Sequence, residues 1–323
     1  MIDINEVAEN VYLIDDQLYS IPKLGCVYLL NEERKALIES GPTTSVNAVL
    51  DGIKKVGVRA EDIAYIIVTH IHLDHAGGAG VLVKGMPQAQ VVVHHRGAKH
   101  LVSPAKLVTS VIEAQGREAM VGYGEVSLIE PHRVQAIYED NTIELSDKQV
   151  LKFIDAPGHA PHELCIFESR NGGLFTGDAV GMYIAEDEIL LPFHPPPNFD
   201  LELCTNTLRK LVKLNAAVIY FSHFGISNKV QENLQLAIDK LQLWEDIVAK
   251  VWKEDTFDDA AGRMIAQACA ELEPIRGMKS LHEYITKVHI PLCAAGHIKY
   301  YQEKYQALDR WRKGESNQGK NRK

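Results

Sequence analysis

The stretch THIHLDHAGG, residues 69–78, is the part of the sequence from which the fold can be predicted. It places three histidines and one aspartate in ten positions, directly after the apolar run IAYIIV and before two glycines. An apolar run of this length is typical of a buried β-strand. Residues two apart in an extended segment point the same way, so His70 and His72 can bind one ion. Asp74 and His75 can face a second ion once the chain turns, and the stretch therefore predicts a metal site at a strand end.

Three more segments place a possible metal ligand just past a strand-like run. VLKFID is followed by APGHAPHE with His159, GGLFTGD ends at Asp178, and AAVIYF is followed by SHFG with His223. A glycine near each of these residues lets the backbone approach an ion closely. With the first stretch, the motifs supply five histidines and two aspartates, about the number of ligands that two ions with open positions need.

The order of these motifs resembles that of the metallo-β-lactamase superfamily of metallohydrolases. The resemblance rests on His-x-His-x-Asp-His with two glycines, a later Pro-Gly-His, a Thr-Gly-Asp and a late strand-end histidine, and it covers about residues 5–228. It implies a four-layer αββα sandwich with the metals at one edge between two sheets. The residues by themselves predict only an α/β fold rich in antiparallel pairing.

The resemblance also implies a role for each motif residue. The first metal would be bound by His70, His72 and His159, the second by Asp74, His75 and His223, and Asp178 would bridge the two. The cofactors would be two divalent ions, zinc in the first place and iron or manganese as alternatives. A hydroxide between the metals would attack an ester-like bond of a small molecule, in a thioester, lactone or phosphodiester. Asp74 would help to orient or relay the proton.

Departures from particular branches of the superfamily narrow the substrate. Class B β-lactamases lack the bridging aspartate, whereas Asp178 is present here, so penicillin-type substrates are not expected. Glyoxalase II and the acyl-homoserine lactonases keep all seven ligands. The alternative hypothesis is an oxidoreductase similar to the persulfide dioxygenases, with one iron bound by His70, His159 and Asp178. In that case Asp74, His75 and His223 would have no role at the metal.

The chain divides by pattern into a catalytic part and a helical part. Residues 1–228 are rich in strand-like runs and are expected to form the catalytic domain, with a lid-like insertion at about 95–140. Residues 229–312 carry apolar residues at helical spacing and predict a C-terminal helical extension. Residues 313–323 contain no apolar side chain and are expected to be a disordered tail.

Composition excludes several classes of protein. A net charge of -9 argues against nucleic acid as a partner, because such binding needs a basic face. The sequence contains no apolar run long enough to cross a membrane and no signal peptide pattern. Its five cysteines are widely spaced and are expected to be reduced thiols in a cytoplasmic protein. The helical stripe that contains Trp244 is interpreted as core or as the face of a homodimer.

Some polar residues remain outside the ligand set. Tyr183 and His194 are candidates for the wall of a substrate pocket, the first because a lactonase tyrosine binds substrate and the second because it lies in a proline-rich loop. His162 is interpreted either as a support for the metal ligands or as a residue with a solvent-facing or structural role. His94 and His100 are expected at a strand end and on a polar surface.

Overall fold

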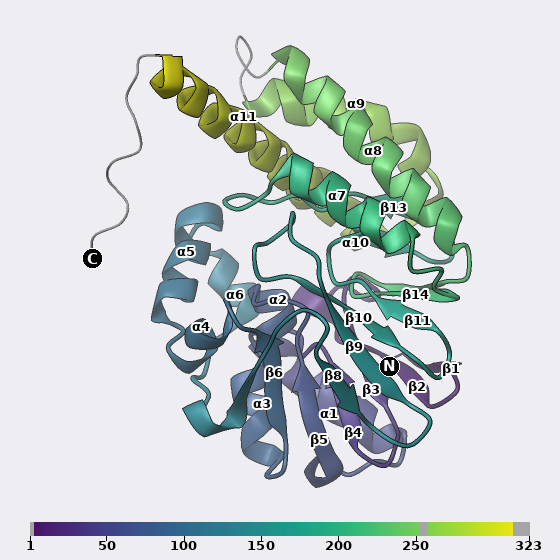
Figure 1. Cartoon of the computed structure of the whole chain (residues 1–323). Coiled ribbons are helices and arrows are strands. Elements are labelled where there is room, and N and C mark those ends of the chain that lie inside the picture. The colour runs from purple at the N-terminus through teal and green to yellow at the C-terminus, as the bar shows by residue number, and fades with distance from the viewer. Residues whose placement is uncertain (1–2, 252–256, 313–323) are drawn as a thin grey trace.

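Two β-sheets packed face to face form the centre of the protein, with helices on both outer faces (Figure 1). The computed structural model describes residues 3–251 and 257–312. The layer between the sheets is a core of buried side chains from both of them, including Tyr28, Phe175 and Tyr220. The Tyr28 ring meets the rings of Phe175 and Tyr220 edge-on, with centroids 5.2 and 5.5 Å apart. The predicted four-layer αββα sandwich is confirmed.

The first sheet has seven strands in chain order. They are β1 (Ile4–Ala8), β2 (Val11–Asp15), β3 (Cys26–Leu30), β4 (Lys35–Ile38), β5 (Ile63–Ile67), β6 (Gln90–His94) and β7 (Val134–Ile137). The strands from β1 to β4 pair antiparallel, and those from β4 to β7 pair parallel. Helices α1 (Val46–Lys55) and α3 (Ala79–Gly85) bury apolar side chains against its outer face.

The second sheet has six strands in the order β15, β14, β11, β10, β9, β8. Their bounds are β8 (Thr142–Glu144), β9 (Val150–Asp155), β10 (Leu164–Glu168), β11 (Gly173–Phe175), β14 (Val218–Phe221) and β15 (Gly225–Ser227). The outer face of this sheet is covered by α7 (Leu201–Val212) and α8 (Val230–Val251). Asp200 caps α7 by accepting a hydrogen bond of 2.9 Å from the Leu203 backbone N–H.

The C-terminal helices pack beside the sandwich around a core of their own. After α8 they comprise α9 (Phe257–Leu272), α10 (Lys279–Tyr284), a π-helical turn (Ile285–His289) and α11 (Ile290–Arg312). Their core includes Trp244 and the hairpin of β12 (Met182–Ile184) and β13 (Ile189–Leu191). Of the helices in the described ranges, none combines the length and the apolar character that a membrane span requires.

The segment expected to form a lid has two parts that differ in structure. Its helices are α4 (Ala98–Val102), α5 (Ala105–Gln115) and α6 (Ala119–Tyr123), which lie together at one side of the molecule (Figure 1). Its last strand, β7, pairs parallel with β6 and belongs to the first sheet. The boundary predicted at residue 140 is therefore too late, because a strand that extends the sheet is not part of a lid. The tail predicted at 313–323 lies outside the described residues.

Helix α11 packs closely against the loop that follows β13. His289 places its Nε2 atom 2.8 Å from the Pro192 carbonyl oxygen, and the His194 backbone N–H lies 3.2 Å from the Cys293 sulfur. A Cβ atom built on Gly296 would lie 1.9 Å from the His194 carbonyl oxygen. A glycine at this position therefore allows an approach of helix and loop that a larger residue would prevent.

We expect Gly296→Ala to lower the free energy of unfolding by about 1–3 kcal/mol, because the added methyl group meets a backbone oxygen that cannot rotate away. Gly262→Ala in α9 is the matched control, since a Cβ there has no neighbour within 4 Å. That control should be neutral or more stable by up to about 1 kcal/mol. Urea unfolding followed by circular dichroism measures both, and equal stabilities would contradict the close packing of α11.

Candidate metal centre

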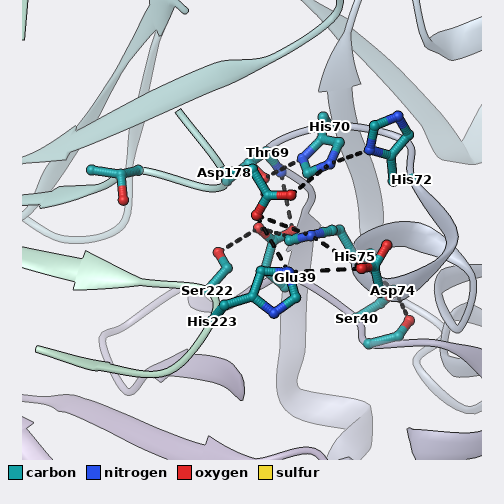
Figure 2. Close-up of polar contacts among 12 residues, drawn as sticks. Glu39, Ser40, Thr69, His70, His72, Asp74, His75, Asp178, Ser222 and His223 are labelled. Carbon is teal, nitrogen blue, oxygen red and sulfur yellow. Dashed lines mark hydrogen bonds and ion pairs between the residues drawn. The ribbon is translucent and has the colours of Figure 1, made fainter. Parts of the chain in front are cut away.

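The predicted ligands converge on one edge of the sandwich because the strands that precede them end there. His70 follows β5 in the first sheet, and His159, Asp178 and His223 follow β9, β11 and β14 in the second. β11 and β14 are parallel, and β9 runs the same way because both β9 and β11 are antiparallel to β10. The helix α2 (Leu73–Ala76) then turns the chain back across this edge. Figure 2 shows six of the predicted ligands pointing toward one another, namely His70, His72, Asp74, His75, Asp178 and His223.

The structure arranges these seven side chains in two groups. The first group contains His70, His72, His159 and Asp178, and the second contains Asp74, His75 and His223. Within each group the possible ligand atoms all lie within 4.8 Å of one another. The His72 Nδ1 atom is 3.0 Å from the His70 Nε2 atom and 2.9 Å from the His159 Nε2 atom. Each group could therefore hold one metal ion.

The carboxylate of Asp178 lies between the two groups, with one oxygen toward each. Its Oδ1 atom is 3.4 Å from Nε2 of both His75 and His223. Its Oδ2 atom is 3.2 Å from the His159 Nε2 atom and 3.8 Å from that of His70. Among the described residues, both oxygens and the Nε2 atoms of His75 and His223 are buried without a hydrogen-bond partner. Buried polar atoms of this kind fit bound metal ions, which would give each of them a partner.

The protonation states of the ligands follow from burial and from neighbouring charge. Burial lowers the pKa of His70 and of His72 well below its usual range, and neighbouring imidazoles lower it further. Both rings are therefore neutral, the form that binds a metal. Burial also lowers the pKa of His75, but the carboxylates of Asp178 and Glu39 outweigh it and raise that pKa well above its usual range. A cation at this position would replace the proton on His75.

The outer nitrogens of the histidine rings are held by groups from four parts of the chain. His159 Nδ1 lies 2.8 Å from the Phe193 carbonyl oxygen, and His223 Nδ1 lies 2.9 Å from that of Leu24. The other two contacts are His70 Nδ1 to Thr69 Oγ1 at 3.1 Å and His75 Nδ1 to Glu39 Oε1 at 3.1 Å. Contacts of this kind fix the orientation of a ring and leave its inner nitrogen free for a metal.

Glu39 is the functional residue that the sequence pattern did not reveal. It follows β4 and is 1% exposed. Its carboxylate accepts hydrogen bonds from the hydroxyl of Thr69 at 2.6 Å and from that of Ser222 at 2.9 Å, in addition to the His75 contact. The sequence signal for Glu39 is its position directly after the strand-like run KALI. Other residues of the site also follow such runs.

A cavity of about 410 Å³ opens beside the two groups. His72 and Asp74 line it, so it leads to the candidate metal centre. His162 also lines it and is only 9% exposed. Burial, followed by the charge of neighbouring imidazoles, lowers the pKa of His162 to about 3. His162 is thus a buried neutral ring beside the first group, and the solvent-facing interpretation is wrong.

The two residues predicted to line a substrate pocket lie outside the wall of this cavity. Tyr183 is in β12, where its ring stacks on Phe221 with centroids 4.6 Å apart. His194 faces α11, with its ring 4.5 Å from Phe199 and its Nδ1 atom 3.3 Å from the His297 Nε2 atom. In the loop after β13 it is instead the neighbouring Phe193 that faces the cavity. Neither Tyr183 nor His194 lines this cavity. For His194 the reason is that its side chain and that of the adjacent Phe193 point to opposite sides.

We expect Glu39→Gln to weaken metal binding about 10- to 100-fold, because it removes the charge that orients His75 from behind. The measurement is competition for zinc with a chromophoric chelator. Glu33→Gln is the control, since Glu33 carries the same charge on an exposed turn. If both variants retained wild-type affinity, Glu39 would be a packing residue without influence on the site.

Comparison with known proteins places this geometry in a family. The model of the Metallo-beta-lactamase superfamily matches residues 24–223. A metallo-beta-lactamase fold-containing protein of Sulfurisphaera tokodaii is 26% identical over 234 residues, which are 70% of this chain and 84% of that protein. An N-acyl homoserine lactonase of Bacillus thuringiensis is 27% identical over 244 residues, 66% of this chain and 86% of the lactonase.

A solved structure extends the likeness beyond the sandwich. The metallo-beta-lactamase family protein of Thermus thermophilus covers 93% of this chain and 95% of its own, with a TM-score of 0.66 and 18% identity. At this identity the likeness concerns the fold alone, and it includes the C-terminal helices. The family match, which spans the positions of all seven predicted ligands, is the stronger finding. This chain belongs to the metallo-beta-lactamase superfamily.

Proposed function

We propose that this protein is a dinuclear metal-dependent hydrolase that cleaves an ester-like bond of a small molecule, in a thioester, lactone or phosphodiester. The observation that carries the proposal is the Asp178 carboxylate, with one unpartnered oxygen toward each ligand group. A carboxylate can bridge two ions about 3.5–4 Å apart. Without a metal, a proton on His75 would offset part of the charge, but both carboxylate oxygens would stay buried without a hydrogen-bond partner, which is costly.

The residues that would bind the ions follow from the two groups. His70, His72 and His159 would bind the first ion, and Asp74, His75 and His223 the second, with Asp178 shared between them. Zinc suits this set best, since imidazole nitrogen and carboxylate oxygen are its common ligands. Two bound divalent ions would lower the pKa of a water molecule and polarise the oxygen of the bond under attack.

The chain itself contributes orientation and selectivity to this reaction. Asp74 belongs to the second group and also lines the cavity, so its carboxylate can orient or accept a proton from a group bound there. Glu39 and the carbonyl of Phe193 hold His75 and His159 in place from behind. The buried side chains around the centre keep bulk water away and strengthen the charge interactions within it.

The family relatives support an ester-like bond as the target. The Bacillus thuringiensis relative is named for lactone hydrolysis, and its similarity covers 86% of its length. A single-iron oxidoreductase is less well supported, because it would use only His70, His159 and Asp178. The second group is buried and assembled as fully as the first, which a one-ion site does not require.

We expect close to two divalent ions per chain in the purified protein, measured by elemental mass spectrometry. Asp178→Asn should lose one or both ions, and its kcat/KM on the ester that the wild type hydrolyses best should fall at least about 100-fold, the scale of losing a metal-site contact. Asp51→Asn on the exposed face of α1 is the matched control and should retain both ions and activity.

Two results would contradict the proposal. A single iron per chain, with oxygen consumption on thiol or persulfide substrates, would favour the one-iron alternative. A fully metallated and fully active Asp178→Asn variant would exclude the bridging role of this carboxylate.

A further inference from the structure

Apolar side chains line much of the cavity beside the candidate metal centre. Leu107 and Val111 of α5 face it from one side, and Val288 and Leu292 near the start of α11 face it from the other. Phe193, which lies 5.6 Å from the ring of His159, closes the inner end. A cavity of about 410 Å³ with such walls suits a small molecule that has an apolar body.

The same cavity carries a cluster of positive charge. Arg96, Lys99 and Lys106 line it at the start of α4 and α5, and His100 lies among them. Burial lowers the pKa of His100, and the charges of Lys99 and Lys106 lower it further. Among the described residues that line the cavity, Asp74 is the one acidic side chain, and it belongs to the candidate metal centre.

These three cations lack acidic partners of their own. Within ranges 3–251 and 257–312, none of them forms an ion pair, and the Arg96 guanidinium donates only to the Pro161 carbonyl oxygen, at 3.1 Å. Some other exposed lysines are paired, since Lys229 and Lys304 each lie 2.7 Å from a glutamate oxygen. Within the same ranges, Lys54 and Lys55 on α1 form no ion pair. In a chain of net charge -9, three unpaired cations around one cavity form a local excess of positive charge.

We propose that the cavity binds a small amphipathic anion, with its apolar body between α5 and α11 and its carboxylate, phosphate or sulfonate group against Arg96, Lys99 and Lys106. This inference rests on the proposed function, because the bond to be cleaved would lie at the end of the cavity lined by His72 and Asp74. A negatively charged substrate would differ in class from the N-acyl homoserine lactones, which are uncharged.

A binding experiment without turnover tests the charge preference directly. Anilinonaphthalene sulfonate and N-phenylnaphthylamine are fluorescent probes that differ by one sulfonate group. On the metal-loaded full chain at low ionic strength, the anionic probe should bind about tenfold more tightly, and added salt should reduce this preference. Equal affinities for the two probes would overturn the proposal.

Variants show whether the preference belongs to this cavity. Lys99→Gln combined with Lys106→Gln should lower the preference about four- to tenfold, since each exposed cation contributes roughly two- to threefold. The control combines Lys54→Gln and Lys55→Gln, which remove the same charge from exposed positions on α1. If the control lowered the preference as much as the cavity variant, the effect would come from overall charge and the proposal would fail.

Hydrolysis of a matched pair of esters separates the two proposals. The para-nitrophenyl esters of octanoate and of suberate differ by one terminal carboxylate. A higher kcat/KM for the suberate ester, gained through KM and lost in the cavity variant, supports both proposals. Equal hydrolysis of the two esters would overturn the anionic substrate and leave the hydrolase. Anionic-probe binding without hydrolysis of any ester in a broad panel would overturn the hydrolase and retain the binding site.

Discussion

The buried carboxylate of Asp178 is the constraint on which the rest of the site depends. Burial raises its pKa, but the facing imidazoles of His75 and His223 outweigh this effect and hold the pKa below the usual range, so the group is charged. Its backbone N–H donates to Glu163 Oε1 at 2.7 Å, and the preceding Gly177 adopts a φ of +52° in close contact with Thr69. A side chain at position 177 would collide with that threonine. The chain therefore fixes the position of this charge from both sheets before any ion is bound.

The site also depends on parts of the fold that supply no ligand. His159 and His223 are oriented by the carbonyl groups of Phe193 and Leu24, which lie in loops far apart in the sequence. The Phe193 loop is in turn packed against α11 at Gly296. Because a metal ligand tolerates little displacement, the C-terminal helices are a structural support of the centre as well as a wall of the cavity.

The structure brings the seven predicted ligands together in two groups, and the sequence could point to them because their pattern is local. Each lies just past a short apolar run, and a histidine or aspartate at such a place is rare in a hydrophobic core. Glu39 was not predicted because a single acidic residue after a strand is common on protein surfaces. Its contacts with Thr69 and Ser222 depend on pairing between distant segments, which the local sequence does not reveal. The end of the lid was misplaced for a similar reason. The short strand β7 carries no signal of its own, and its parallel partner β6 lies about forty residues earlier.

The pocket residues were the least predictable, and the reason bears on specificity. The predicted ligands follow strand ends, whose positions result from sheet packing. The cavity walls come instead from α4, α5 and α11, which pack on the outside of the sandwich. Changes in those helices can alter the substrate without moving a ligand. Overall charge is also a poor guide to what binds there, since charges farther than about 8 Å apart are screened in physiological salt. Three cations around one cavity can therefore attract an anion to a protein whose net charge would repel it.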